Sequence, residues 1–423
     1  MSNMKEVLEK AEIHAHTKGN SAQDSQLTSD SDQRTTMSRY VILLFAAACG
    51  MSVANIYFAQ PLLDQLSIEF GIEHSLIGIV ITITQIFYGV GLLLLVPLGD
   101  MLNQRRLIIG QMLLSMIALV IVGTAPTSTV LFVGMALVGL LAVVTQTLVA
   151  LAATMAAPAE RGRVVGMVTS GIVIGILLAR SIAGIVTDLA GWRAVYLVSA
   201  VMLLLIVCMF ARVLPHYERE VRSLSYAQLL GSVITLFVQE RMLRIRSVLA
   251  LLIFADFSIL WTSLVLPLSA PPLSLSYSAI GAFGLAGVAG ALAAARAGKL
   301  ADRGYGQRTT GFSLVLLLLS WLFIRYTEQS LFALMIGIVL LDLAVQAVHV
   351  TNQTMTLPLR AEARSRLTAG YMVFYSIGSA SGSIASTHVY AHYGWGGVCL
   401  LGASVSAAAL LFWAMTRRVG AAA

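Results

Sequence analysis

Charged residues are scarce in this chain of 423 residues, and the scarcity decides its class. Asp, Glu, Lys and Arg make up 11% of the sequence, whereas soluble proteins carry about 25%. Hydrophobic residues make up 58%, and the mean hydropathy is +0.85. A soluble protein of this length has no interior large enough for so much apolar surface. The composition therefore excludes a soluble fold and predicts a protein that crosses the membrane many times.

Cysteine is also rare, and its placement excludes two kinds of site. The three cysteines, Cys49, Cys208 and Cys399, lie within apolar runs, where neither a disulfide framework nor a metal-ligand spacing is possible. We expect no metal site and no cofactor. The sequence also lacks an HExxH motif, a GxSxG motif and a Walker loop. These absences argue against a membrane enzyme or sensor and against an ATP-driven pump.

Apolar runs dominate the chain after its polar start. Each run is close to the length of about 20 residues that an α-helix needs to cross a bilayer. Within lipid only a helix satisfies the backbone of a continuous apolar run, so we predict an all-α membrane protein with twelve transmembrane helices. The runs lie near 40–62, 77–99, 106–124, 128–155, 163–188, 193–213, 246–268, 278–300, 309–326, 330–356, 366–390 and 395–415.

Lys and Arg residues fall almost entirely on one side of the predicted membrane. With both termini in the cytoplasm, 23 of the 27 Lys and Arg residues lie in inner segments, and the outer loops hold only Arg193 and Arg325. Cytoplasmic loops carry such an excess, which explains the net charge of +7 without a nucleic-acid partner. We expect a multi-pass protein of the bacterial inner membrane with both termini in the cytoplasm.

Landmarks of the first half of the chain recur in the second half at one separation. Ser75-Leu-Ile-Gly78 recurs 203 residues later as Ser278-Ala-Ile-Gly281. Gly191-Trp192 recurs as Gly394-Trp395, again 203 residues later. Landmarks in the same order at the same offset indicate two homologous halves. Repeated halves in a membrane chain are typical of transporters whose site lies between them.

The repeat predicts the domain organisation. Residues 1–37 form a polar, disordered cytoplasmic tail without the apolar core of a signal peptide. Two six-helix halves cover residues 38–213 and 246–418. The cytoplasmic linker 214–245 is too short in its apolar part to span the membrane, and its apolar residues predict an interfacial helix.

A charged, glycine-containing turn lies between the second and third spans of each half. The second-half turn runs from Gly298 to Arg308, and a degenerate copy runs from Pro97 to Arg106. A carboxylate at a helix end can pair with arginines and with the N-terminus of a neighbouring helix. Glycine lets the backbone turn tightly.

These features resemble the major facilitator superfamily, whose signature at this turn reads approximately Gly-x-x-x-Asp-Arg-x-Gly-Arg-Arg. The second-half turn matches at Gly298, Asp302 and Arg303, whereas the first-half turn keeps fewer of the signature residues. In that family the turn is a cytoplasmic latch that holds the outward-facing state. The alternative is that these charges only set the topology. The resemblance implies the latch role for Asp100, Arg105, Asp302, Arg303 and Arg308.

The fifth span resembles that of bacterial twelve-span proton-coupled efflux permeases of the drug and sugar efflux type. Gly166 and Gly175 have the spacing of the glycine-rich pattern in those permeases. Arg180 occupies the position of the proline in that pattern, which weakens the inference of antiport. The small residues also suit close helix packing, which is the simpler interpretation.

Charged side chains inside the predicted spans need a reason, because each costs about 2.5–3.5 kcal/mol at the bilayer centre. Arg180 lies in the outer half of span five, and Asp256 lies near the middle of span seven. They could pair across a central cavity in one state, or Asp256 could bind and release a proton. Static pairing with other polar groups is the alternative.

Span ten carries a polar stripe. Asp342, Gln346, His349 and Gln353 are spaced by four, three and four residues, which places them on one helical face. Such a stripe indicates either a hydrated cavity or proton path, or hydrogen bonds between helices. Gln85 in span two is an uncharged candidate for the lining of the same cavity.

Two functions fit these patterns. The first is a secondary active transporter that exports a small organic molecule by proton antiport through alternating access. The second is an importer or facilitator of a sugar or another metabolite on the same fold. Either function implies a small-molecule substrate and a lipid bilayer as partners, the first adds protons, and we expect a monomer.

Overall fold

The computed structural model describes residues 37–157, 160–214, 226–287, 296–360 and 363–417. All the regular elements in these residues are helices. Nine helical segments within the described residues are long and apolar enough to cross a membrane. The chain is therefore an all-helical membrane protein, as its composition predicts. The predicted tail 1–37 lies, apart from its last residue, outside the described residues.

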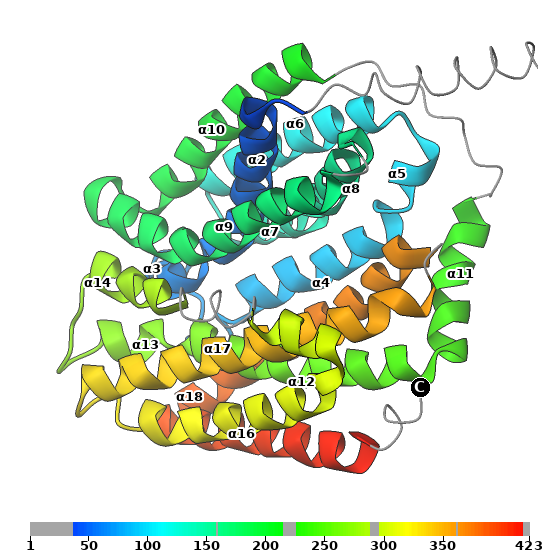
Figure 1. Ribbon diagram of the computed structural model, residues 1–423. Coiled ribbons are helices and arrows are strands. Elements are labelled where there is room, and N and C mark those ends of the chain that lie inside the picture. The colour runs from blue at the N-terminus through cyan, green and yellow to red at the C-terminus, as the bar shows by residue number, and fades with distance from the viewer. Residues whose placement is uncertain (1–36, 158–159, 215–225, 288–295, 361–362, 418–423) are drawn as a thin grey trace, which may run out of the picture.

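Residues 37–214 form one helical bundle, the N-terminal bundle (Figure 1). Its α2 packs along α9, and its α4 packs against α7. Pro61 ends the regular first helix, because proline has no N–H to donate, and a short 3-10 turn follows. In chain order the helices are α2 (Arg39–Tyr57), η1 (Gln60–Leu62), α3 (Leu63–Phe70), α4 (Ile79–Leu94), α5 (Leu98–Met101), α6 (Gln104–Gly123), α7 (Ser128–Leu141), α8 (Val144–Met155), α9 (Arg161–Ala190) and α10 (Trp192–Val213).

Residues 226–417 form a second bundle beside the first, the C-terminal bundle (Figure 1). Its α12 packs along α18, and its α16 packs along α17. In chain order the helices are α11 (Tyr226–Gln239), α12 (Arg241–Ser263), α13 (Val265–Ser269), α14 (Tyr277–Ala282), η2 (Phe283–Gly287), η3 (Ala301–Tyr305), α16 (Gly306–Ile324), α17 (Leu331–Thr356), η4 (Leu357–Leu359) and α18 (Arg364–Thr416).

The repeated Gly-Trp pair has the same backbone geometry in both bundles. Gly191 joins α9 to α10 with φ 80° and ψ 162°. Gly394 bends α18 sharply with φ 63° and ψ −164°, so the predicted spans 366–390 and 395–415 are the two arms of one element. A positive φ strongly favours glycine, which explains why glycine occupies both positions.

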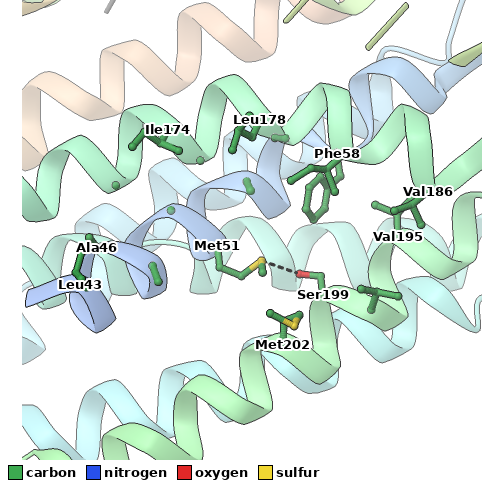
Figure 2. A pocket seen from close by; sticks show the side chains of 18 residues that line it. Leu43, Ala46, Met51, Phe58, Ile174, Leu178, Val186, Val195, Ser199 and Met202 are labelled. Carbon is green, nitrogen blue, oxygen red and sulfur yellow. Dashed lines mark hydrogen bonds between the residues drawn. The ribbon is translucent and has the colours of Figure 1, made fainter. Parts of the chain in front are cut away.

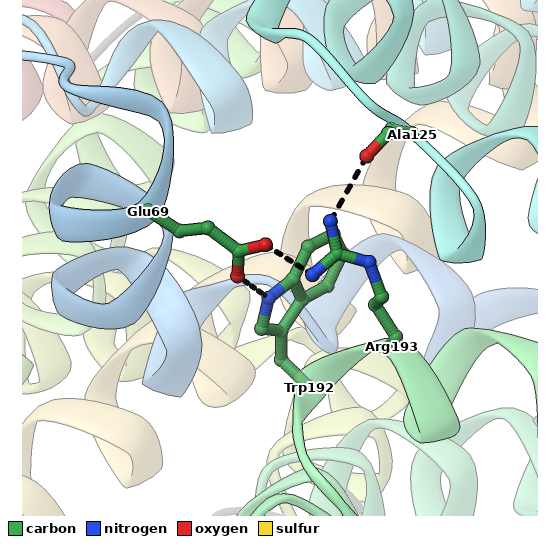
Figure 3. A network of polar contacts seen from close by, with 4 residues as sticks. All are labelled: Glu69, Ala125, Trp192 and Arg193. Atoms are coloured by element: carbon green, nitrogen blue, oxygen red, sulfur yellow. Dashed lines mark hydrogen bonds and ion pairs between the residues drawn. The ribbon is translucent and has the colours of Figure 1, made fainter.

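A polar network fixes one end of the N-terminal bundle (Figure 3). The Glu69 carboxylate accepts hydrogen bonds from the indole N–H of Trp192 and from the guanidinium of Arg193. Arg193 also donates to the carbonyl oxygen of Ala125 at 3.0 Å. The network ties α3 and the start of α10 to the turn after α6. In the other bundle, the repeated Trp395 donates instead to the carbonyl oxygen of Ile324 at 3.0 Å.

The segment predicted as a linker, 214–245, contains α11, the first helix of the C-terminal bundle. Leu229, Val233 and Leu236 are buried, and α11 packs against α18 and α12. The hydroxyl of Tyr226 donates to the carbonyl oxygen of Leu94 in the N-terminal bundle at 2.8 Å. The helix therefore contacts both bundles. Residues 215–225 of the predicted linker lie outside the described residues.

Glycine allows α12 and α18 to approach each other closely. A Cβ atom on Gly378 would lie 2.1 Å from the carbonyl oxygen of Leu251, and one on Gly382 would lie 2.3 Å from that of Ala255. Real Cβ atoms do not come this close to backbone, so no side chain fits at these two positions without moving a helix.

Replacing Gly382 by alanine should destabilise the protein, because overpacking a tight contact typically costs about 1–3 kcal/mol. We expect a lower melting temperature of the purified protein in detergent. Gly110 in α6 is the control, since a Cβ there would meet no atom within 4 Å. Gly110→Ala should keep or raise the melting temperature, because alanine is the better helix former. An unchanged melting temperature for Gly382→Ala would contradict the close approach of the two helices.

Candidate functional site

Arg180 of α9 lies buried where the two bundles meet. Its side chain is 2% exposed, and its Nε donates to Oε1 of Gln60 at 2.8 Å. The guanidinium carbon lies 3.8 Å from the ring centroid of Trp261, which belongs to α12 of the other bundle. Its Nη2 has no hydrogen-bond partner among the described residues. A buried cation loses the free energy of its hydration, and the cation–π contact with the face of the indole compensates for part of this loss.

Asp342 of α17 lies at the indole N–H of Trp261. The carboxylate is 5% exposed and accepts a hydrogen bond from the indole N–H of Trp261 at 3.1 Å. Gly287 makes room for it, since a Cβ there would lie 2.9 Å from Asp342 Oδ2. Among the described residues Arg180 and Asp342 form no direct ion pair, but their opposite charges attract each other at longer range. We call Gln60, Arg180, Trp261 and Asp342 the central site.

An aromatic layer lies beside the central site. The hydroxyl groups of Tyr57 and Tyr375 form a hydrogen bond of 2.6 Å between the two bundles. The rings of Tyr88 and Phe254 pack against Tyr375 with centroid distances of 6.2 and 4.0 Å. Gln85 is 2% exposed, and its Oε1 has no hydrogen-bond partner in the described part of the chain. The predicted cavity residue Gln85 is therefore buried in α4.

At one end of the molecule the bundles are joined by direct backbone contacts. The Asp188 carboxylate accepts hydrogen bonds from the backbone N–H groups of Tyr277 and Ser278 at 3.2 and 2.8 Å. A Cβ on Gly281 would lie 2.4 Å from the carbonyl oxygen of Arg180. Thr82 donates its hydroxyl to the carbonyl oxygen of Ala380 at 2.9 Å. These contacts come from residues 75–82, 180–188, 277–281 and 380–387, which we call the closed end.

The predicted polar stripe of α17 runs away from the closed end. Asp342 belongs to the central site, whereas Gln346, His349 and Gln353 are half-buried. Nδ1 of His349 lies 2.9 Å from the hydroxyl of Tyr371 and forms a hydrogen bond with it. The stripe therefore connects the central site with the end of the molecule opposite the closed end.

Arg246 is a buried cation whose role the sequence did not indicate. Sequence reasoning placed it among the charges of the inner loops, but it is 1% exposed. It donates to Oγ1 of Thr310 at 3.0 Å and to Oδ1 of Asn352 at 3.1 Å. Its Nε and Nη2 have no hydrogen-bond partner among the described residues. The only signal in the sequence is its position at the first residue of an apolar run.

Asp256 does not face Arg180 in this conformation, contrary to the pairing that we considered from their depths. It is fully buried inside the C-terminal bundle. Its carboxylate accepts hydrogen bonds from the indole N–H of Trp321 at 3.0 Å and from the hydroxyl of Ser406. These partners lie on α16 and α18, so Asp256 joins three helices of one bundle. The carboxylate opposite Arg180 is Asp342.

The predicted latch residues lie on the two charged turns. Asp302, Arg303 and Arg308 are exposed and form no ion pair with another described residue. Arg105 donates to the carbonyl oxygen of Ala211. The side chain of Asp100 lies outside the described residues. The second-half turn bends at Gly304, with φ 84°.

Comparisons with known proteins agree on one family. The family model of the Major Facilitator Superfamily matches residues 41–312 and 246–422. The chain is 48% identical over 377 residues to the uncharacterized transporter YgaY of Escherichia coli O157:H7, covering 89% of this chain and 95% of that protein. It is 24% identical over 379 residues to the multidrug resistance protein MdtG of Proteus mirabilis, covering 84% and 90%. A bacterial homolog of the human lysosomal transporter Spinster, solved in an inward-facing and occupied conformation, superposes with a TM-score of 0.71 at 13% identity, covering 90% and 96%.

The contacts of Asp256 predict different effects for two substitutions. Asp256→Leu leaves the Trp321 N–H and the Ser406 hydroxyl buried without an acceptor, and each unsatisfied group costs about 1–3 kcal/mol. We expect this variant to melt at a lower temperature in detergent. Asp256→Asn keeps one carbonyl oxygen as the acceptor for the Trp321 N–H, so its melting temperature should fall much less. Equal melting temperatures for both variants and the wild type would contradict the structural role of this carboxylate.

Proposed function

Because the chain belongs to the major facilitator superfamily, we propose that it exports a small organic molecule in exchange for protons, by alternating access at the central site. The chain is a membrane transporter of a small molecule and not an enzyme, as its family and relatives agree. One observation carries the proposal of coupling. Two opposite charges, Arg180 and Asp342, come from different bundles and both contact Trp261, the guanidinium over the ring and the carboxylate at the indole N–H.

The position of the two charges provides a mechanism for coupling. Arg180 belongs to the N-terminal bundle, whereas Trp261 and Asp342 belong to the C-terminal bundle. Ionised Asp342 attracts Arg180 and favours the arrangement in which the bundles meet at the closed end. Two unit charges 4 Å apart attract by about 4 kcal/mol at an effective dielectric constant of 20, and the attraction between Arg180 and Asp342, which lie farther apart, is weaker in proportion to their distance. A proton on Asp342 removes this attraction and shifts the population toward the other arrangement.

The contacts between the bundles support an inward-facing conformation. Five hydrogen bonds between the bundles lie at the closed end, and a further one joins Tyr57 and Tyr375. The distribution of Lys and Arg places the closed end on the outside. The half-buried stripe of α17 then faces the cytoplasm. The unpaired Asp302, Arg303 and Arg308 fit a latch that is released in this state.

We also propose twelve spans in two six-helix halves with both termini in the cytoplasm of a bacterial cell, and a monomer as the working unit. The two arms of α18 count as separate spans, and the α14–η2 segment covers the first part of the predicted span 278–300, of which residues 288–295 lie outside the described residues. The shared geometry of Gly191 and Gly394 supports two related halves. The name of MdtG favours export over import.

Import or facilitated diffusion of a sugar or another metabolite is the second candidate function. Arg180 favours it, because this arginine replaces the proline expected in span five of the antiporters that the sequence resembles. A facilitator equilibrates its substrate without a gradient and needs no carboxylate that titrates.

Proton exchange can be measured in everted membrane vesicles energised to a pH gradient. A panel of cationic drugs, sugars and amino acids is added while an acidification dye reports the gradient. A transported compound should collapse the gradient. Asp342→Asn and Arg180→Ala should lower the initial rate by about tenfold or more, equivalent to about 1.4 kcal/mol. Asp256→Asn is the matched control, and it should keep most of the rate. Full activity of Asp342→Asn would rule out coupling at this carboxylate, and equilibration of a labelled compound without a gradient would favour the facilitator.

Access to the stripe tests the conformation and the orientation together. In a background in which Cys208 is replaced by serine, Gln353→Cys should react with a membrane-impermeant maleimide in everted vesicles but not in intact cells with a permeable outer membrane. Glu73→Cys near the closed end should show the opposite pattern. Labelling of Gln353→Cys from outside only would contradict the proposed orientation.

A further inference from the structure

An apolar groove lies between α2, α9 and α10 of the N-terminal bundle (Figure 2), and none of its lining residues belongs to the central site. Residues of α2, α9 and α10 line a volume of about 370 Å³. Leu43, Ile174 and Met202 at its rim are 57%, 54% and 43% exposed, so the groove faces the lipid. Its one polar lining residue, Ser199, already donates its hydroxyl to Asn55 Oδ1 at 2.6 Å. The groove therefore offers no free polar group and suits a hydrocarbon chain.

Glycines create the groove. A Cβ on Gly50 would lie 2.7 Å from the carbonyl oxygen of Gly171, and one on Gly175 would lie 2.2 Å from that of Gly50. The backbones of α2 and α9 thus touch at the floor, where no side chain fills the space above the crossing. In a bilayer this space is not left empty, because lipid chains make the missing dispersion contacts.

A polar cavity lies along the same seam between α2 and α9, at the start of both helices. Its volume is about 270 Å³, and its lining includes Arg39, Glu160 and Arg163. Arg39 is one helical turn before Leu43 of the groove, and Arg163 is two turns before Gly171. The polar cavity and the apolar groove are therefore successive parts of one face of each helix.

The charges of the polar cavity favour an anion. The lining contains two arginines and one carboxylate. The Glu160–Arg163 ion pair is long, with 3.9 Å between nitrogen and oxygen. Arg39 forms no ion pair with another described residue. Arginine binds phosphate oxygens through charge-assisted hydrogen bonds. The Lys and Arg distribution places this end at the cytoplasmic surface, where anionic lipids attract basic residues.

We propose that the α2–α9 seam binds one anionic phospholipid of the cytoplasmic leaflet, with its phosphate at Arg39 and Arg163 and an acyl chain in the groove. The order of the two cavities matches such a molecule, with a charged head at the membrane surface and a hydrocarbon tail toward the bilayer centre. The site is separate from the central site and does not depend on the proposed transport cycle.

Native mass spectrometry of the purified, delipidated full-length protein tests the site. The protein is incubated with phosphatidylglycerol, phosphatidylethanolamine or phosphatidylcholine, and the retained lipid is counted. Wild-type protein should retain one phosphatidylglycerol in preference to the other two. Arg39→Gln combined with Arg163→Gln should weaken this retention by about tenfold, because two cationic contacts are lost. Ala47→Phe, which fills the groove from an exposed position, should weaken it as well.

Matched controls distinguish a specific lipid site at the α2–α9 seam from non-specific contact with lipid elsewhere on the surface. Arg106→Gln removes an exposed arginine of α6, and Val133→Phe enlarges an exposed side chain of α7; neither residue lines the seam. Both controls should retain phosphatidylglycerol like the wild type. Equal retention of the three lipids, preference for phosphatidylethanolamine, or full retention by both seam variants would overturn the proposal.

Discussion

The centre of this protein is arranged around one buried cation, whose charge must be stabilised by protein groups because no bulk water is available there. Arg180 is 2% exposed in a protein whose surroundings are hydrocarbon. Gln60 of its own bundle and Trp261 of the other bundle meet that need, and Trp261 in turn holds Asp342. Because the compensation comes from both bundles, the proposed mechanism makes the stability of the closed end depend on the charge of the central site. In that mechanism a proton or a substrate biases the conformation.

A second constraint is that tight helix contacts in a membrane require residues without side chains. Gly281 and Gly184 let α9 and α14 touch at the closed end, and Gly378 and Gly382 do the same for α12 and α18. Close glycine contacts also leave a groove on the outside of the N-terminal bundle. No side chain fills the space above the contacts of Gly50 with Gly171 and Gly175, and we propose that an acyl chain of the bilayer occupies it.

Much of the architecture was readable from residue patterns. Composition and run length predicted an all-helical membrane protein, and the Gly-Trp repeat marked two positions of similar backbone geometry, both with positive φ. The intramembrane charges were found because charge in an apolar run is rare. Their partners were not found: depth alone suggested Asp256 for Arg180, but Asp256 is bound to Trp321 and Ser406. Depth along a helix does not specify which way a side chain points relative to helices distant in sequence.

The sequence by itself determined the class of the protein, the positions of its charged turns and the polar face of α17, because these follow from local periodicity, composition and spacing. The family was indicated by the resemblance of the charged turns to a known signature. Only the tertiary structure decided that Trp261 contacts both Arg180 and Asp342, that Arg246 is buried, and that two cavities share the α2–α9 seam. Those facts depend on contacts between helices that are far apart in the chain. Such contacts are set by the packing of whole helix faces, which no single stretch of sequence encodes.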